Sequence, residues 1–276
     1  MKQLKKESKI RLVTGEQFAK ILTLFNDEVY RIIAVVTWYT GFFPKDLLRL
    51  PYLGSGINSG LREYGPDELS SLSSEVLYKL DSKGRAPHTY MSGEVWEFIC
   101  EHWMPERMRR AMRYQAKHGV TTCNKHLFLA IDGTPVSYKM LYNHFSKILT
   151  YPGKPFGLEY FTPTMLCNSF TAALIHSVIE SHDLLYDEDL YVIVSQAVLD
   201  CTGRNISKKR CSLYVQFILE SADNYVRTVN TGMSESLNAS FHTYVNVWRE
   251  CNVTSHAGSG AFPLRIFDGT GGFVPD

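Results

Sequence analysis

One almost entirely apolar helical segment, at about residues 28–39, constrains this chain more than any other feature. A helix that is apolar on every side must be covered by other elements or by lipid. A membrane-spanning helix needs roughly 18 to 20 consecutive apolar residues, and the longest apolar run here, 32–39, is shorter and contains Thr37. The segment therefore predicts a buried helix of a protein with no membrane span. Its apolar residues include Ile32, Ile33, Val35, Val36 and Trp38.

Helical patterns flank this segment on both sides. Thr14 followed by Gln17 is a capping-box signature, and apolar residues continue from it at helical spacing, at Phe18, Ile21, Leu22 and Phe25. After the buried helix, Pro44 suits a first helical turn, and Pro51 ends the short apolar stretch that follows. We therefore expect one helix after Thr14 and another from Pro44.

The rest of the chain predicts mostly helices and one small sheet. A short, mostly apolar strand pattern at 76–80 and a second strand at 85–91 flank the turn residues 81–84, and together they predict an antiparallel hairpin. A third short strand is expected at 127–130. Helices are expected from Ser92, at about 141–149, from Pro163, and at about 190–198, 213–219 and 237–248. The predicted fold class is mainly α with a small antiparallel β-sheet (α+β).

Charge excludes a strongly cationic DNA coat, because 29 Lys and Arg residues face 28 Asp and Glu residues, a formal net charge of +1. Any basic surface must be local. Two clusters stand out, 204–210 on an expected loop and 107–117 within a helix. Each is either solvated charge or a surface that contacts phosphates. The candidate DNA-binding residues are Arg204, Lys208, Lys209, Arg210, Arg109, Arg110 and Arg113.

Six cysteines without a C-x-x-C pair indicate reduced thiols and favour a cytoplasmic protein. The basic N-terminus is followed by an amphipathic segment, which argues against a secretory signal. His118, Cys123 and His126 have metal-like spacing but no second pair, so no metal site is expected. No cofactor is expected either.

Four segments, taken in order, resemble the catalytic domain of the tyrosine recombinases, the phage-integrase family. Residues 12–18 are similar to its opening helix cap, and 40–48 (TGFFPKDLL) to its T-G-x-R-x-x-E-L-L motif. Residues 161–170 (FTPTMLCNSF) are similar to t-P-H-x-L-R-H-x-F. Tyr214 lies about where the nucleophilic tyrosine falls, and Lys83 about where a catalytic lysine falls. The resemblance covers residues 12–222.

The resemblance implies two arginines that clamp the scissile phosphate, a histidine and a lysine that handle protons, and a tyrosine that attacks the phosphate. Fixed cations of this kind stabilise the charge that a pentavalent phosphorane gathers. Here the two arginine positions hold Phe43 and Cys167, and the histidine position holds Thr164. Asn168 follows the second arginine position. Asp46, Lys83 and Tyr214 are the remaining counterparts, so little strand cleavage is expected.

The sequence thus predicts a basic lead (1–11), a recombinase-like domain (12–222) and a C-terminal extension (223–276). The expected function is a catalytically impaired, integrase-like protein that binds DNA during integration or recombination of a mobile element. Double-stranded DNA is the expected partner, with another recombinase subunit as a second one, because the separate DNA-clamping domain usual in the family is not recognisable. Two alternatives stay open: a divergent active recombinase that uses Tyr214, and a non-catalytic protein-interaction scaffold. Tyr214, Phe43 and Cys167 also fit plain core packing.

Overall fold

The computed structural model of the chain describes residues 10–69, 76–79, 89–120, 125–149, 158, 160–182 and 189–229. These residues are mainly helical with one two-stranded sheet, which confirms the predicted fold class. The helices are α1 (Gly15–Leu22), α2 (Glu28–Thr40), α3 (Pro44–Leu47), α4 (Pro66–Leu69), α5 (Gly93–His102), α6 (Met104–His118), α7 (Tyr138–Ile148), α8 (Pro163–His182), α9 (Leu190–Thr202) and α10 (Lys208–Val229). The strands are β1 (Val76–Tyr78) and β2 (Thr89–Met91), and a 3-10 turn, η1, spans Gly56–Asn58.

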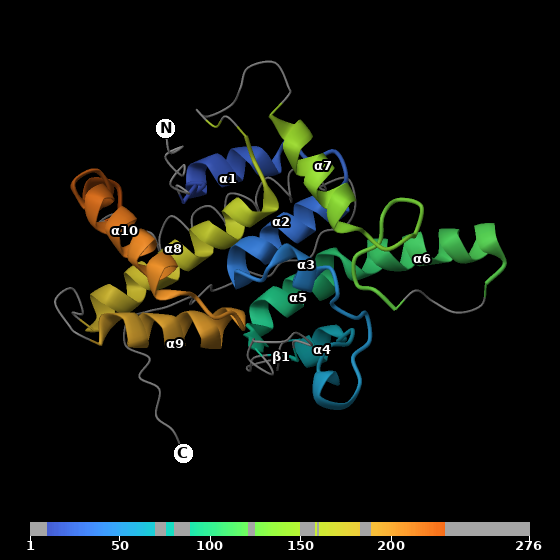
Figure 1. Ribbon diagram of the computed structural model, residues 1–276. Helices are drawn as coiled ribbons and strands as arrows, with labels where there is room; N and C mark the ends of the chain where they lie inside the picture. Colours follow the sequence, from blue (N-terminus) through green and yellow to red (C-terminus); the bar gives the residue numbers. More distant parts are fainter. Residues whose placement is uncertain are drawn as a thin grey trace, which may run out of the picture.

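Helix α2 is the buried helix that its composition predicts. It packs against α8, α3, α5 and α7 (Figure 1), and Ile32, Ile33 and Val36 are completely covered. Asp27 caps it by accepting a hydrogen bond from the Val29 amide over 3.1 Å. Gly41 ends it in the left-handed conformation, with φ of 60°. The helix begins and ends within one residue of the prediction.

The capping box and the hairpin strands are also confirmed. Thr14 accepts a hydrogen bond from the Gln17 amide, while the Gln17 side chain accepts one from the Thr14 amide. Strands β1 and β2 pair antiparallel, with Val76 opposite Met91 and Tyr78 opposite Thr89. The predicted turn between them, with Lys83, lies outside the described residues.

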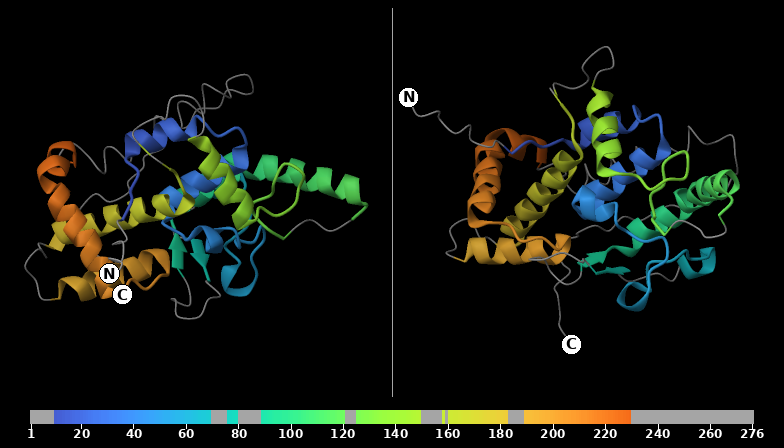
Figure 2. Two further views of the ribbon diagram at one scale, coloured as in Figure 1. Left: turned by 45° about the horizontal axis from the view of Figure 1, so that its top comes forward. Right: turned by 45° about the vertical axis from the view of Figure 1, so that its right-hand side comes forward.

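Two clusters of buried apolar side chains form the core. The larger surrounds α2 and includes Met165 and Leu166 from the first turns of α8. The smaller lies between α8, α9 and α10, which form one side of the molecule in Figures 1 and 2. Helix α8 therefore runs from one cluster into the other. Its residues 167–171, in the N-terminal half of the helix, lie at the junction.

Several local predictions need correction or fall outside the described residues. Helix α10 begins at Lys208, five residues earlier than expected, and Ser207 caps it by accepting from the Arg210 amide over 3.3 Å. Residues 127–130 form no regular strand and make only an isolated bridge between Leu129 and Pro135. The helix expected at 237–248 lies beyond the described part. Within that part, no helix combines the length and apolar character that crossing a membrane requires.

Candidate nucleic-acid interface

Residues from four distant segments meet at the N-terminal half of α8. Helix α8 presents Cys167, Asn168 and Thr171 at the junction of the two apolar clusters. Cys167 and Thr171 are joined within the helix, because the Thr171 hydroxyl donates to the Cys167 carbonyl over 2.7 Å. Around them lie the start of α3, the loop between α9 and α10, and the first turns of α10.

Asn168 binds Tyr214 and Arg210 through a single oxygen. Its Oδ1 accepts a hydrogen bond from the Tyr214 hydroxyl over 3.0 Å and one from Arg210 Nη2 over 2.9 Å. Asn168 is 8% exposed and Tyr214 is 1% exposed. A buried phenol that donates to an amide oxygen is a satisfied core group. Its proton is directed at Asn168.

The neighbouring Ser169 fastens the N-terminal segment to the same part of α8. Its hydroxyl accepts from the Val13 amide over 2.8 Å and contacts the Val13 carbonyl over 3.0 Å. Asn168 adds a longer contact, from Nδ2 to the Arg11 carbonyl over 3.5 Å. The segment that leads into α1 is therefore held beside the site.

Arg204 reaches the site from the loop that follows α9. Gly203, in the left-handed conformation with φ of 63°, ends α9 and turns the chain. The Arg204 guanidinium then donates from Nη2 to the Thr171 hydroxyl over 2.8 Å and from Nε to the Thr202 hydroxyl over 3.4 Å. It also lies over the ring of Phe43, 5.1 Å from its centroid, a cation–π arrangement.

Cys167 contacts the chain just before α3, within electrostatic reach of Arg204 and Arg210. Its thiol donates to the Phe42 carbonyl over 2.9 Å and is completely buried. Burial raises the pKa of this thiol to about 12, although Arg204 and Arg210 act in the opposite direction. The group therefore stays a neutral thiol near neutral pH and is not a nucleophile.

The same basic cluster also contains two lysines. Lys208 and Lys209 are exposed on the first turn of α10 rather than on a loop. The Lys208 ammonium lies over the ring of Tyr191 on α9, 5.2 Å from its centroid. Arg204 and Arg210 are the members of this cluster whose side chains hydrogen-bond to side chains of α8 among the described contacts.

Six of the residues singled out in the sequence come together here: Phe43, Cys167, Asn168, Arg204, Arg210 and Tyr214. Asp46 is buried in α3, where its carbonyl accepts a hydrogen bond from the Tyr78 hydroxyl over 3.3 Å. Thr164 is half-buried on the first turn of α8. Lys83 lies outside the described residues. Sequence reasoning missed Thr171, although its position three residues after Asn168 places both on one helix face.

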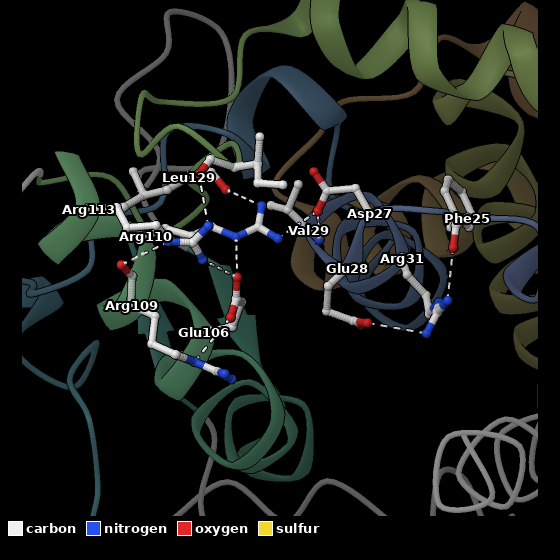
Figure 3. A network of polar contacts seen from close by, with 11 residues as sticks. Phe25, Asp27, Glu28, Val29, Arg31, Glu106, Arg109, Arg110, Arg113 and Leu129 are labelled. Atoms are coloured by element: carbon white, nitrogen blue, oxygen red, sulfur yellow. Dashed lines mark hydrogen bonds and ion pairs between the residues drawn. The ribbon is translucent and has the colours of Figure 1, made fainter. Parts of the chain in front are cut away.

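The basic cluster on α6 differs from its prediction. Arg110 is not at the surface: it is 3% exposed and ion-paired with Asp27 over 2.7 Å and with Glu106 over 2.8 Å. It also donates to the Leu129 carbonyl over 3.1 Å (Figure 3). Arg107 is buried too, and it donates to the His126 carbonyl over 3.0 Å. The assignment of Arg110 to a DNA-facing surface is therefore wrong.

Arg109 and Arg113 remain exposed on α6. Each pairs with Glu106, over 3.2 Å and 3.1 Å respectively, as Figure 3 shows. Glu106 thus serves three arginines of this helix and lowers the net charge of its surface. Surface ion pairs of this kind are weak. The exposed surface of α6 is therefore less cationic than its sequence indicated.

Among the described residues, no group of three or more His, Cys, Asp or Glu side chains has a geometry that would hold a metal ion. Cys123, the centre of the metal-like spacing, lies outside them.

Comparisons with known proteins give matches among solved structures. No protein-family model matches the chain, and no curated protein sequence matches it. Among solved structures, the chain is similar to a pre-cleavage complex of the XerH site-specific recombinase bound to its difH substrate, with a TM-score of 0.47 and 18% identity. That match covers 78% of this chain and 53% of the recombinase chain.

A post-cleavage complex of XerH bound to a palindromic difH substrate matches similarly, with a TM-score of 0.46, 15% identity, and coverage of 79% and 52%. The chain therefore spans about half the length of the solved structures it matches. The likeness concerns the fold alone.

Proposed function

We propose that this chain is a tyrosine-recombinase-like protein that binds double-stranded DNA and takes part in recombination or integration of a mobile element without cutting the DNA itself. The observation that carries the proposal is the convergence on α8 of the residues that the sequence motifs singled out. Segments around residues 43, 168, 204 and 214 have no local reason to meet, yet they share direct contacts. This convergence supports one shared site built from these segments.

The local positive charge beside α8 supports DNA binding. Arg204 and Arg210 bring two guanidinium groups to one face of α8, and Lys208 and Lys209 are exposed beside them. Phosphate contacts supply most of the affinity of non-specific DNA binding. A local cluster of four cations within seven residues meets that need in a chain whose total charge is near zero.

The chemistry of the same residues supports impaired catalysis. Phe43 and Cys167 carry no charge, and a thiol whose pKa is raised by burial cannot stabilise a phosphorane. The Tyr214 hydroxyl is buried and bonded to an amide oxygen, which is a poor proton acceptor. The loss of one preorganised donor to a developing oxyanion costs about 10²- to 10³-fold in rate. Losing two clamp arginines and a histidine together costs more than that.

The binding part is tested by measuring duplex affinity at two salt concentrations. The wild-type chain should bind, and its affinity should fall steeply as salt rises. Charge reversal of Lys208, Lys209 and Arg210 to Glu should weaken binding at least tenfold and flatten the salt dependence. The matched control reverses three exposed lysines elsewhere, Lys79, Lys125 and Lys139, and gives the same net charge. Equal losses in both triple variants would contradict a local interface.

The cleavage part is tested with a nicked suicide substrate. A chain that does not cut DNA forms no covalent adduct, and this is the expected result. An adduct that disappears in Tyr214→Phe would instead identify a divergent active recombinase. Absent DNA binding, together with tight binding to another protein, would identify the interaction scaffold that the sequence leaves open.

A further inference from the structure

We infer that two copies of this chain associate in the absence of DNA, with the outer face of α6 of each copy docked on segment 52–68 of the other. This inference goes beyond the proposed DNA binding and does not depend on it. It assigns the exposed arginines of α6, Arg109 and Arg113, to a protein interface instead of a DNA surface.

Helix α6 has one covered face and one uncovered face. The covered face is held against the chain that follows the helix, where Arg107 donates to the His126 carbonyl and Arg110 donates to the Leu129 carbonyl. In Figure 1 the helix extends from α5 away from the other helices. Six exposed residues on its uncovered side define the α6 patch: Met108, Arg109, Met112, Arg113, Ala116 and Lys117.

The α6 patch consists of two parallel ridges. Its three apolar residues follow one another at every fourth position, so they form one ridge about 12 Å long. Its three basic residues have the same spacing and form a second ridge beside the first. Met112 is 62% exposed, although it is a large apolar side chain. Methionine and arginine are enriched in protein–protein interfaces, and exposed apolar side chains that gather on one face mark such sites.

The basic ridge keeps a net positive charge. Glu106 pairs with Arg109 over 3.2 Å and with Arg113 over 3.1 Å, so one carboxylate serves both exposed guanidiniums. Lys117 adds a further cation on the next turn. A DNA backbone would complement the basic ridge but leave the methionine ridge exposed. A protein surface that combines carboxylates with apolar side chains complements both ridges.

Segment 52–68, which lies between α3 and β1 and includes η1, has these complementary features. Leu53 is 61% exposed and Ile57 is 51% exposed. Its charged side chains are all exposed and are mainly acidic, with three carboxylates and one guanidinium. They belong to Arg62, Glu63, Asp67 and Glu68. The segment therefore offers two apolar side chains and a net negative charge to the α6 patch.

The segment is a fixed surface of the molecule. The Trp96 indole of α5 donates to the Arg62 carbonyl over 2.8 Å, and the Lys79 amide donates to Asn58 Oδ1 over 2.6 Å. Both surfaces are exposed in the same chain, so they do not cover each other within one molecule. In a pair of copies related by a two-fold axis, each copy gives its α6 patch and receives its partner's, so the contact forms twice.

A charge-swap experiment tests the pairing by sedimentation velocity of the full chain without DNA. The wild type should show a monomer–dimer equilibrium that weakens as salt rises. Arg109→Glu with Arg113→Glu, and separately Glu63→Lys with Asp67→Lys, should each raise the dissociation constant at least tenfold. An equimolar mixture of these two double variants should recover the dimer, because each α6 patch then meets a segment of opposite charge.

The control is a double reversal on α1 and α7, Lys20→Glu with Lys139→Glu, which changes the net charge equally and should dimerise like the wild type. A wild-type chain that stays monomeric at every concentration would overturn the inference. A mixture of the two double variants that stays monomeric would overturn the pairing of α6 with segment 52–68.

The methionine ridge is tested without any change of charge. Met112→Gln should raise the dissociation constant about fivefold or more, since an apolar anchor is lost from the contact. Val192→Gln, which alters a 68% exposed side chain of α9, should dimerise like the wild type. Equal dimerisation of Met112→Gln and the wild type would overturn the docking of α6.

Duplex binding separates this inference from a DNA-binding role of α6. Arg109→Glu with Arg113→Glu should weaken duplex binding no more than Lys20→Glu with Lys139→Glu. A much larger loss, together with unchanged dimerisation, would make α6 a DNA surface and overturn the inference. If the wild-type chain binds no duplex, the proposed function fails, and the dimerisation measurements still decide this inference.

Discussion

The Tyr214 hydroxyl donates a hydrogen bond to Asn168 Oδ1 across 3.0 Å, joining residues 46 positions apart in the sequence. Asn168 also accepts from Arg210, which lies one helical turn before Tyr214 on α10. The amide therefore links α8 to two consecutive turns of α10. Tyr214, which the resemblance compares with a nucleophilic tyrosine, is therefore buried and hydrogen-bonded in this structure.

Tyr214→Phe tests whether the hydroxyl is structural. The variant loses one buried hydrogen bond, while Asn168 keeps its bond to Arg210, so the free energy of unfolding should fall by about 1 kcal/mol. Duplex affinity should stay within about twofold. Tyr142→Phe, which alters an exposed tyrosine of α7, is the control and should change neither quantity. Denaturant unfolding and fluorescence anisotropy measure the two effects; a large loss of DNA affinity would assign the hydroxyl to binding.

Arg110→Ala should be strongly destabilising. The substitution leaves Asp27 and Glu106 without their buried partner, and breaking a buried ion pair in this way costs about 3 to 5 kcal/mol. Arg109→Ala, one residue earlier and 70% exposed at its side chain, should change stability by less than about 0.5 kcal/mol. Urea unfolding compares the two. Similar losses would contradict the structural role assigned to Arg110.

Gly41 connects the end of α2 to α8. Its φ is +60°, and an added Cβ would lie 2.2 Å from a ring carbon of Phe170. Gly119→Ala is the matched control, because Gly119 has a φ of +65° with nothing within 4 Å. The control should lose about 1 to 2 kcal/mol for the left-handed conformation alone. Gly41→Ala should lose clearly more in thermal or urea unfolding, and equal losses would show that Phe170 moves away at no cost.

Glu28 should make stability depend on pH. Desolvation by burial raises the pKa of this carboxyl from 4.5 to about 7, although Arg31 opposes the shift. The folded protein therefore holds the proton more tightly than the unfolded chain. The resulting stability is fully present below about pH 4.5 and is lost as the pH rises through about 7.

Glu28→Gln should remove that dependence. The variant should gain stability over the wild type at pH 8, at about 1.4 kcal/mol for each unit of pKa difference. Glu68→Gln changes an exposed carboxylate whose pKa is lowered by its hydrogen bond with Arg62, so it should keep the wild-type dependence between pH 5.5 and 8. Urea unfolding at those two pH values gives the comparison. A wild-type chain with equal stability at both would contradict a raised pKa at Glu28.

Elements with strong local signals could be predicted from the sequence. The capping pair Thr14 and Gln17, the apolar stretch of α2 and the Pro44 start of α3 each depend on residues within one or two helical turns. Their boundaries agree with the structure to within a few residues. The strand pair 76–78 and 89–91 was predictable for the same reason.

The site depended on contacts that no local pattern contains. Asp27, the partner that buries Arg110, is 83 residues away, so a run of basic residues on α6 looked like an exposed surface. Arg204 binds Thr171 across 33 residues, and Arg210 binds Asn168 across 42. The sequence indicated a basic loop at 204–210. Tertiary packing decides which of these cations form hydrogen bonds with α8.

Whether this chain binds DNA through the basic residues beside α8 is tested by the duplex affinity of Asn168→Asp as a function of salt. The substitution keeps the size of the side chain but puts a carboxylate against Arg210, so the cation is neutralised from within. We expect an intact fold by near-ultraviolet circular dichroism, at least tenfold weaker duplex binding and a salt slope lower by about one. A well-folded Asn168→Asp that binds duplex with wild-type affinity and salt slope would contradict it.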